Sequence, residues 1–197
     1  MHIQAKCSYV IAFLLVTLSG CAAAVEPEDQ GGDVETQTAA LAYGTPDVPA
    51  ALAVPRGNRL AFLRDATGQQ IYGCQANATG YGWVLIAPDA DLFKPNGRLA
   101  GSHYAGPTWE ALDGSTVVGA RVAAYSADPS AIPWLLLSAV SHAGHGRMSK
   151  VSFIQRLETA GGLAPTTGCD ADHVGAQVGV DYTATYYFYE PKPSCNR

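Results

Sequence analysis

Short runs in which apolar and polar residues alternate, or in which β-branched residues gather, recur from residue 59 to residue 189. Runs of this length and period predict β-strands. They lie at Arg59–Arg64, Gln70–Gln75, Tyr81–Ala87, Arg98–Tyr104, Ser115–Ala124, Val151–Glu158 and Tyr182–Tyr189. Residues that tolerate the positive φ of a reversing turn predict turns at Asp65–Gly68, Pro95–Gly97 and Asp113–Gly114. The pattern therefore predicts a series of antiparallel hairpins.

Two further segments have a less regular pattern. Pro133–His142 contains the apolar run Trp134–Leu137, which fits a buried strand or a short helix because periodicity does not separate the two in so short a run; we favour the strand. Asp170–Gln177 begins with an aspartate, a good N-cap, and is predicted to form one or two helical turns. The expected fold class is all-β, an antiparallel β-sandwich or partly closed barrel with at most one short helix.

The first residues have the order of an export signal. Lys6 precedes an apolar run from Tyr9 to Leu18, about half of the ~20 residues that a membrane-spanning helix needs. Leu18-Ser19-Gly20-Cys21 resembles the bacterial lipobox, which implies cleavage after residue 20 and acylation of Cys21. By the same resemblance Ala22 implies sorting to the outer membrane. The alternative is an ordinary secretory signal cut near residues 22–24.

The chain then divides into four parts. A signal peptide (1–20) is followed by a lipidated cysteine with an acidic tether (21–47), a single β-rich domain (48–190) and a C-terminal tail (191–197). The stretch Ala22–Pro55 holds no lysine or arginine, and its acidic residues lie among Gly, Gln and Thr, a composition typical of disorder. Its prolines Pro46, Pro49 and Pro55 predict an extended lead-in to the first strand.

Composition fits one domain and excludes one class of partner. Apolar residues make up 48% of the chain, with 21 glycines and 12 prolines, as expected for many short elements joined by tight turns. Loss of Lys6 with the signal leaves 12 − 1 = 11 basic residues against 17 acidic ones, so the formal charge changes from −5 to 11 − 17 = −6. Nucleic-acid binding shows as a basic stripe, so we exclude that class.

Cysteine usage is that of an exported protein. Cys7 leaves with the signal and Cys21 carries lipid, so Cys74, Cys169 and Cys195 remain in an oxidising compartment. We predict a disulfide between Cys74 and Cys169, because both lie inside the folded region while Cys195 lies in the tail. The alternative pairs Cys169 with Cys195 and leaves Cys74 as a buried thiol.

Several longer strings carry a family resemblance. They are His103-Tyr104-Ala105-Gly106-Pro107-Thr108-Trp109-Glu110, Ile132-Pro133-Trp134-Leu135-Leu136-Leu137, Ile154-Gln155-Arg156-Leu157, Thr159-Ala160-Gly161-Gly162 and Tyr182-Thr183-Ala184-Thr185-Tyr186-Tyr187-Phe188-Tyr189. With them the chain resembles the domain-of-unknown-function 3455 family of bacteria and fungi, from about Val48 to Tyr189. The resemblance implies a small exported protein with no agreed activity, although fungal members are sometimes labelled dehydrogenases.

The sequence does not support the dehydrogenase label. Gly144–Ser149 supplies two glycines of a dinucleotide-binding motif but has Ser149 in place of the third, without a following helix or acidic partner. Signatures of serine hydrolases, zincins, nucleoside triphosphatases and thioredoxin-like proteins are absent from the sequence. We therefore expect no cofactor.

Histidines are the main candidates for chemistry. His103, Tyr104 and Glu110 lie close together in sequence and are candidates for an acid–base pair beside a pocket. The intervening Gly106-Pro107 breaks the strand, so alternation does not decide whether His103 and Glu110 share a face.

Two sets of metal ligands can be drawn from the same residue types. One combines His103 and Glu110 with His173, and the other combines His142 with His145. Histidines in loops and on strands more often bond to water or to a backbone carbonyl, so no metal is expected.

Aromatic residues are a second kind of candidate. Alternation in the last strand sends Tyr187 and Tyr189 to one face and Tyr186 and Phe188 to the other. One face must be core, and the other either lines an apolar pocket or is covered by the rest of the fold. The candidate ligand-binding residues are His103, Tyr104, Trp109, Glu110, Trp134 and His173.

Taken together, these features predict a lipid-anchored protein of the bacterial cell envelope, of the outer membrane by the lipobox resemblance. Its β-domain is expected to bind a small molecule or an envelope protein. The alternatives are an enzyme that uses His103 with nearby polar groups, and a purely structural envelope component.

Overall fold

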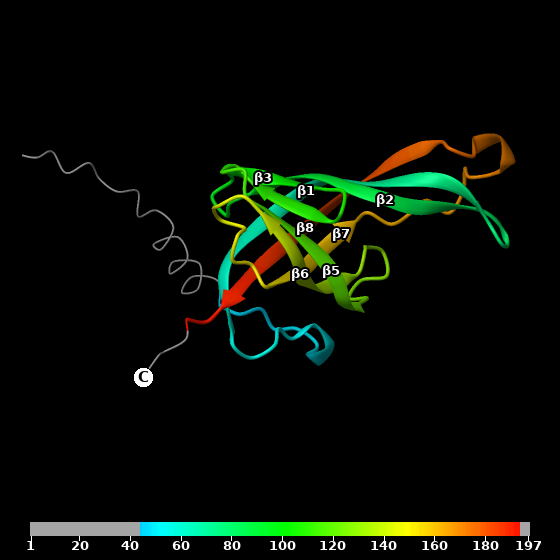
Figure 1. Cartoon of the computed structure of the whole chain (residues 1–197). Helices are drawn as coiled ribbons and strands as arrows, with labels where there is room; N and C mark the ends of the chain where they lie inside the picture. Colours follow the sequence, from blue (N-terminus) through cyan, green and yellow to red (C-terminus); the bar gives the residue numbers. More distant parts are fainter. Residues whose placement is uncertain (1–43, 194–197) are drawn as a thin grey trace, which may run out of the picture.

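The computed structural model describes residues 44–193, which form one antiparallel β-sheet closed into a barrel (Figure 1). The strands are β1 (Asn58–Asn77), β2 (Gly80–Phe93), β3 (Leu99–Tyr104), β4 (Thr108–Ala111), β5 (Thr116–Tyr125), β6 (Trp134–Ala143), β7 (Phe153–Gly161) and β8 (Gln177–Pro191). Each strand pairs with the next, and β8 returns to pair with β1. Two single-turn 3₁₀ helices, η1 (Ala50–Leu52) and η2 (Ala171–His173), are the helical elements of the described residues. The all-β prediction is confirmed.

The turn predicted at Asp65–Gly68 is wrong, because these residues lie in the middle of the continuous strand β1. Gly68 lies opposite Ala90 of β2, and a Cβ atom there would overlap the backbone of Asp89 and Ala90. The glycine therefore serves a close approach between strands rather than a reversal. The chain reverses after Asn77 instead, where the side chain accepts a hydrogen bond from the Thr79 amide at 2.9 Å.

The other predicted turns are confirmed. Gly97 and Gly114 have φ values of 77° and 78° in the β2–β3 and β4–β5 connections. The ambiguous segment that begins at Pro133 forms strand β6. Asp170 caps the single turn η2 by accepting a hydrogen bond from the amide of Asp172. The short strand β4 was not predicted from the alternation.

The barrel interior holds the main hydrophobic core. Phe62 and Phe188 stack with ring centroids 4.6 Å apart, and Trp109 and Ile154 are buried beside them. The loop between β6 and β7 covers one end of the barrel. Its Met148 belongs to the core, with only 1% of its surface exposed. The opposite end of the interior is less completely filled, as described below.

A second apolar cluster covers the outer face of β6, β7 and β8. Leu52 of η1 is fully buried there, against a group that includes Leu136, Leu157, Tyr187 and Tyr189. Its carbonyl accepts a hydrogen bond from Gln155 Nε2 at 2.7 Å. The lead-in that was predicted to be extended therefore contains a helical turn, and both faces of β8 are buried, the inner one by Tyr186 and Phe188.

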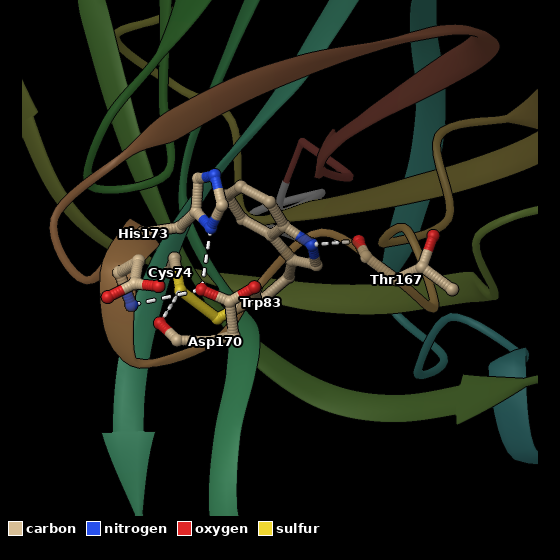
Figure 2. Close-up of a disulfide and its surroundings, with 7 residues drawn as sticks. Cys74, Trp83, Thr167, Asp170 and His173 are labelled. Atoms are coloured by element: carbon tan, nitrogen blue, oxygen red, sulfur yellow. Dashed lines mark hydrogen bonds and ion pairs between the residues drawn. A yellow bond between two sulfur atoms is a disulfide. The ribbon is translucent and has the colours of Figure 1, made fainter.

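The β1–β2 hairpin extends beyond the rest of the barrel, and the segment between β7 and β8 runs beside it (Figure 1). A disulfide between Cys74 and Cys169 joins the two, so the predicted pairing is confirmed. Figure 2 shows Trp83 beside this disulfide, with its indole N–H donated to the Thr167 carbonyl at 2.8 Å. The predicted signal peptide, Cys21, the tether as far as residue 43 and Cys195 lie outside the described residues. Within residues 44–193 there is no helix long and apolar enough to cross a membrane.

Candidate functional site

A cavity of about 730 Å³ opens into the barrel at the end opposite the Met148 loop. Its walls are mostly apolar, with Leu85 and Ile86 of β2, Leu135 and Leu137 of β6, and Leu163 of the β7–β8 segment. A volume of this order, with few polar groups in an apolar wall, is typical of small-molecule sites. Alternation explains Leu135 and Leu137, since inward-facing side chains recur at every second position. Leu85 and Ile86 are consecutive and lie where the β1–β2 register shifts.

Three aromatic rings in mutual contact line the cavity. The His103 imidazole lies parallel to the Trp109 indole at 4.3 Å between ring centroids, and Tyr186 meets both rings edge-on. Gly119 of β5 leaves room for the indole, since a Cβ there would come within 2.9 Å of Trp109 Cζ3. The three rings come from β3, β4 and β8, so barrel closure is what brings them together.

His103 is neutral in this environment. Burial is the main cause that lowers its pKa to about 3, with a smaller contribution in the same direction from the Arg156 charge. Its Nδ1 lies 2.8 Å from the carbonyl oxygen of Thr108, and a carbonyl only accepts, so Nδ1 carries the proton. Nε2 is therefore a hydrogen-bond acceptor, and it makes no hydrogen bond to the described residues.

Two other buried polar groups in the cavity wall have no partner among the described residues. The indole nitrogen Nε1 of Trp109 makes no hydrogen bond. The amide nitrogen of Gln70 lies near the Tyr182 hydroxyl but without the geometry of a hydrogen bond. Buried polar groups in folded proteins are nearly always paired, so these two mark a place where a ligand or water is expected.

Arg156 is the less exposed of the two cations that line the cavity, the other being Arg121. Its Nε and Nη2 donate to the Pro133 carbonyl at 3.2 and 2.9 Å, and it forms no ion pair with a described residue. Its charge also acts on nearby tyrosines: burial raises the pKa of both Tyr182 and Tyr186, and Arg156 opposes that rise. No aspartate or glutamate lines the cavity within residues 44–193.

Two of the predicted candidates, Tyr104 and Glu110, lie on the outer face of the barrel. The β3–β4 register pairs His103 with Trp109 inside, and it pairs Ser102 with Glu110 outside. Glu110 accepts a hydrogen bond of 2.8 Å from the Tyr104 hydroxyl, which raises the pKa of Tyr104. The structure thus separates His103 from Glu110, and the hypothetical acid–base pair is not formed.

The remaining candidates lie elsewhere. Trp134 belongs to the outer apolar cluster and contacts Tyr125. His173 is exposed in η2 beside the disulfide, with Nδ1 2.6 Å from Asp170 Oδ1 (Figure 2). His142 contacts the Val151 carbonyl through Nε2. Nowhere in the described part of the chain do three or more His, Cys, Asp or Glu residues gather as metal ligands.

Sequence reasoning placed His103 and Trp109 at the site but missed Gln70 and Arg156. The available signal for Arg156 was its position two residues after Ile154, where alternation points the side chain inward. The sequence holds no such signal for Gln70, because a glutamine at the start of a run of alternating polar and apolar residues is expected to be exposed to solvent.

Fold and site together define a closed antiparallel β-domain with an interior cavity. The chain belongs to the family described as "Protein of unknown function (DUF3455)", which matches residues 93–190. The matched region runs from the last residue of β2 into β8 and contains His103, Trp109 and Arg156, but not Gln70. No curated protein and no solved structure matches the chain.

Proposed function

We propose that this protein is an exported lipoprotein whose β-domain holds a small, mainly apolar molecule inside the barrel. The observation that carries the proposal is the cavity of about 730 Å³, apolar along its walls and lined by buried polar groups without protein partners. Sites with this combination take ligands whose apolar surface fills the walls while a few polar atoms fix the orientation.

The geometry favours binding over catalysis. A general base works best with a pKa near the operating pH, whereas burial lowers that of His103 to about 3. The carboxylate nearest to His103 in sequence, Glu110, is bonded to Tyr104 on the other face of the sheet. His103 is thus suited to accepting a hydrogen bond from a bound molecule.

The membrane part of the proposal rests on the sequence. Cys21 follows a lipobox-like string, and the acidic stretch after it suits a spacer that holds the domain away from anionic headgroups. An apolar molecule that leaves or enters a bilayer would meet such a domain close to the membrane surface. We place the protein in the bacterial cell envelope, anchored in the outer membrane by lipid.

A neutral fluorescent probe tests the cavity. N-phenyl-1-naphthylamine is expected to bind the folded domain saturably at one site, and Ala164→Trp, which fills the cavity from its wall, is expected to weaken binding about tenfold or more. Ala78→Trp, in the exposed β1–β2 turn, is the matched control and retains binding. Absence of saturable binding by the folded wild-type domain, or equal binding by Ala164→Trp, refutes the cavity proposal.

Mass spectrometry of the membrane-extracted protein tests the anchor. A diacylglyceryl-modified Cys21 at the N-terminus is expected, and Cys21→Ser should move the protein into the soluble envelope fraction. A free, unmodified N-terminus after residue 24 refutes the lipoprotein assignment and leaves the cavity proposal standing.

A further inference from the structure

We infer that the molecule held in the barrel is an amphipathic monocarboxylic acid, with its carboxylate at Arg156 and its apolar body along the cavity walls. The inference rests on the proposed function, since it names the chemical class of ligand for that same cavity.

The charge of the cavity points to an anion. Arg156 lines it without an ion pair among the described residues, and a second cation, Arg121, lines it at an exposed position. No carboxylate of residues 44–193 lines the cavity to offset them. His103 is neutral because burial and the Arg156 charge both disfavour its protonation. The cavity therefore presents one partly buried positive charge, that of Arg156, and one exposed one, that of Arg121, in a protein whose formal net charge is −5.

Leaving a cation partly buried without a counter-ion costs free energy that a bound anion would recover. Arg156 is also held in place, because Nε and Nη2 both donate to the Pro133 carbonyl. This contact fixes the plane of the guanidinium, which also acts on the Tyr186 hydroxyl, and the N–H groups not directed at Pro133 or Tyr186 stay available. A carboxylate is the ligand group whose two oxygens match such a planar donor set.

The neighbouring polar atoms add donors to the same region. The indole N–H of Trp109 is buried and unpartnered, and so is the amide nitrogen of Gln70. Both residues line the cavity with Arg156 and Tyr186. Donors without acceptors suit an oxyanion, which only accepts, better than they suit an amine or another cation.

The rest of the cavity restricts the ligand to one charged end. Leu135 and Leu137 are apolar, and so are the exposed Leu85, Ile86 and Leu163 and the adjacent Ala164. A second charged group buried against these side chains would be unpaired, because the other cation of the cavity, Arg121, is exposed. A molecule with a single carboxylate and an alkyl or aryl body satisfies both parts of the cavity.

A pair of ligands that differ only in the head group provides the test. Dodecanoate and dodecan-1-ol are titrated against bound N-phenyl-1-naphthylamine at pH 7.5, below the critical micelle concentration. The wild-type protein is expected to bind dodecanoate about tenfold or more tightly than the alcohol, as a charge-assisted contact implies.

Substitutions then assign that preference to one side chain. Arg156→Gln should abolish the preference for dodecanoate, because it weakens binding of the carboxylate more than binding of the alcohol, and Arg156→Lys, which keeps the charge, should retain part of the preference. Arg98→Gln removes the same charge from the exposed β2–β3 turn and should change neither affinity.

The outcomes separate the inference from the function on which it rests. If the probe and dodecan-1-ol bind but dodecanoate has no advantage over the alcohol, the carboxylate inference is overturned and the cavity remains a binding site. If the advantage is equal in wild type and in a folded Arg156→Gln variant, Arg156 is not the anchor. If neither probe nor alcohol binds, the proposed function fails and the inference fails with it. Should Arg156→Gln not fold, the head-group comparison in the wild type and in Arg156→Lys decides.

Discussion

The imidazole of His103 lies flat on the indole of Trp109, 4.3 Å from centroid to centroid with 11° between the ring planes. The two residues are direct partners in the β3–β4 register, so the hairpin itself sets the stack inside the barrel. With only 3% of its surface exposed, His103 lies where a charged imidazolium is costly.

The neutral state of His103 predicts an acid-sensitive fold. The folded-state pKa is about 3, below the value of about 6.5 expected in the unfolded chain. The unfolded state therefore binds more protons in this window, and the stabilising contribution, fully present above pH 6.5, is lost as the pH falls towards 3. The free energy of unfolding should change by up to about 1.4 kcal/mol per pH unit on account of this residue.

Denaturant unfolding of the wild type and of His103→Phe between pH 4.5 and 7 checks this expectation. Phenylalanine keeps an aromatic ring on Trp109 but has no proton to bind, so the variant should show a shallower pH dependence. It should also be less stable at neutral pH, because the Thr108 carbonyl loses its partner. Parallel pH profiles, or an NMR titration of His103 near pH 6.5, would contradict the assignment.

Trp109 is expected to contribute to stability through its volume rather than through its N–H group. Trp109→Ala should lower the free energy of unfolding by about 3–5 kcal/mol, since the fully buried indole leaves a cavity in the core. Trp109→Phe should lower the free energy of unfolding by only about 1–2 kcal/mol. Nε1 has no hydrogen-bond partner, so its removal breaks no hydrogen bond. Equal losses for the two variants in chemical denaturation would contradict this expectation.

Much of this fold could be predicted from alternation, turn residues and cysteine positions. The sequence indicated an all-β chain, most of the strands and the Cys74–Cys169 disulfide. The strand β4 was not predicted, because its four residues are too few for an alternating pattern to be recognised. Gly68 was misread because a glycine in a polar stretch has the same local signature in a turn and at a close strand contact.

The candidate site was only half predictable, for a topological reason. His103 and Trp109 are near in sequence, so local patterns could find them. Gln70 and Arg156 reach the same cavity from β1 and β7, and only the closed order of the strands brings those elements together. Conversely, Glu110 is adjacent to Trp109 in sequence but lies on the opposite face, since successive residues of a strand alternate.

The disulfide is expected to hold one wall of the cavity. It joins β1 to the β7–β8 segment that carries Leu163 and Ala164, across a sequence separation of 95 residues. The double variant Cys74→Ser, Cys169→Ser should lose about 2–4 kcal/mol of stability. It should also be cleaved faster than the wild type in the stretch 163–176. Thermal unfolding measures the first effect, and limited digestion with thermolysin, which cleaves beside large apolar residues such as Leu163 and Val174, measures the second. Digestion at the wild-type rate would mean that other contacts hold the segment, such as the hydrogen bond from Tyr72 to the Gly162 carbonyl.

The close approach of β1 and β2 at Gly68 leads to a prediction that also tests whether Gly68 lies in a strand or in a turn. A methyl group at this position would overlap the backbone of Asp89 and Ala90, and backbone atoms paired on both sides cannot move aside cheaply. Gly68→Ala should therefore destabilise the domain by about 1–3 kcal/mol.

Gly82→Ala, in the same hairpin, is the matched control. Its added Cβ meets only the end of the flexible Asn77 side chain, at 3.2 Å, so its effect on the free energy of unfolding should be smaller. If Gly68 instead lay in an exposed turn, alanine would be tolerated there as well as at Gly82. Equal denaturation midpoints for the two variants would therefore argue against the continuous strand β1, and with it against the position of Gln70 in the cavity wall, because the β1–β2 register fixes both.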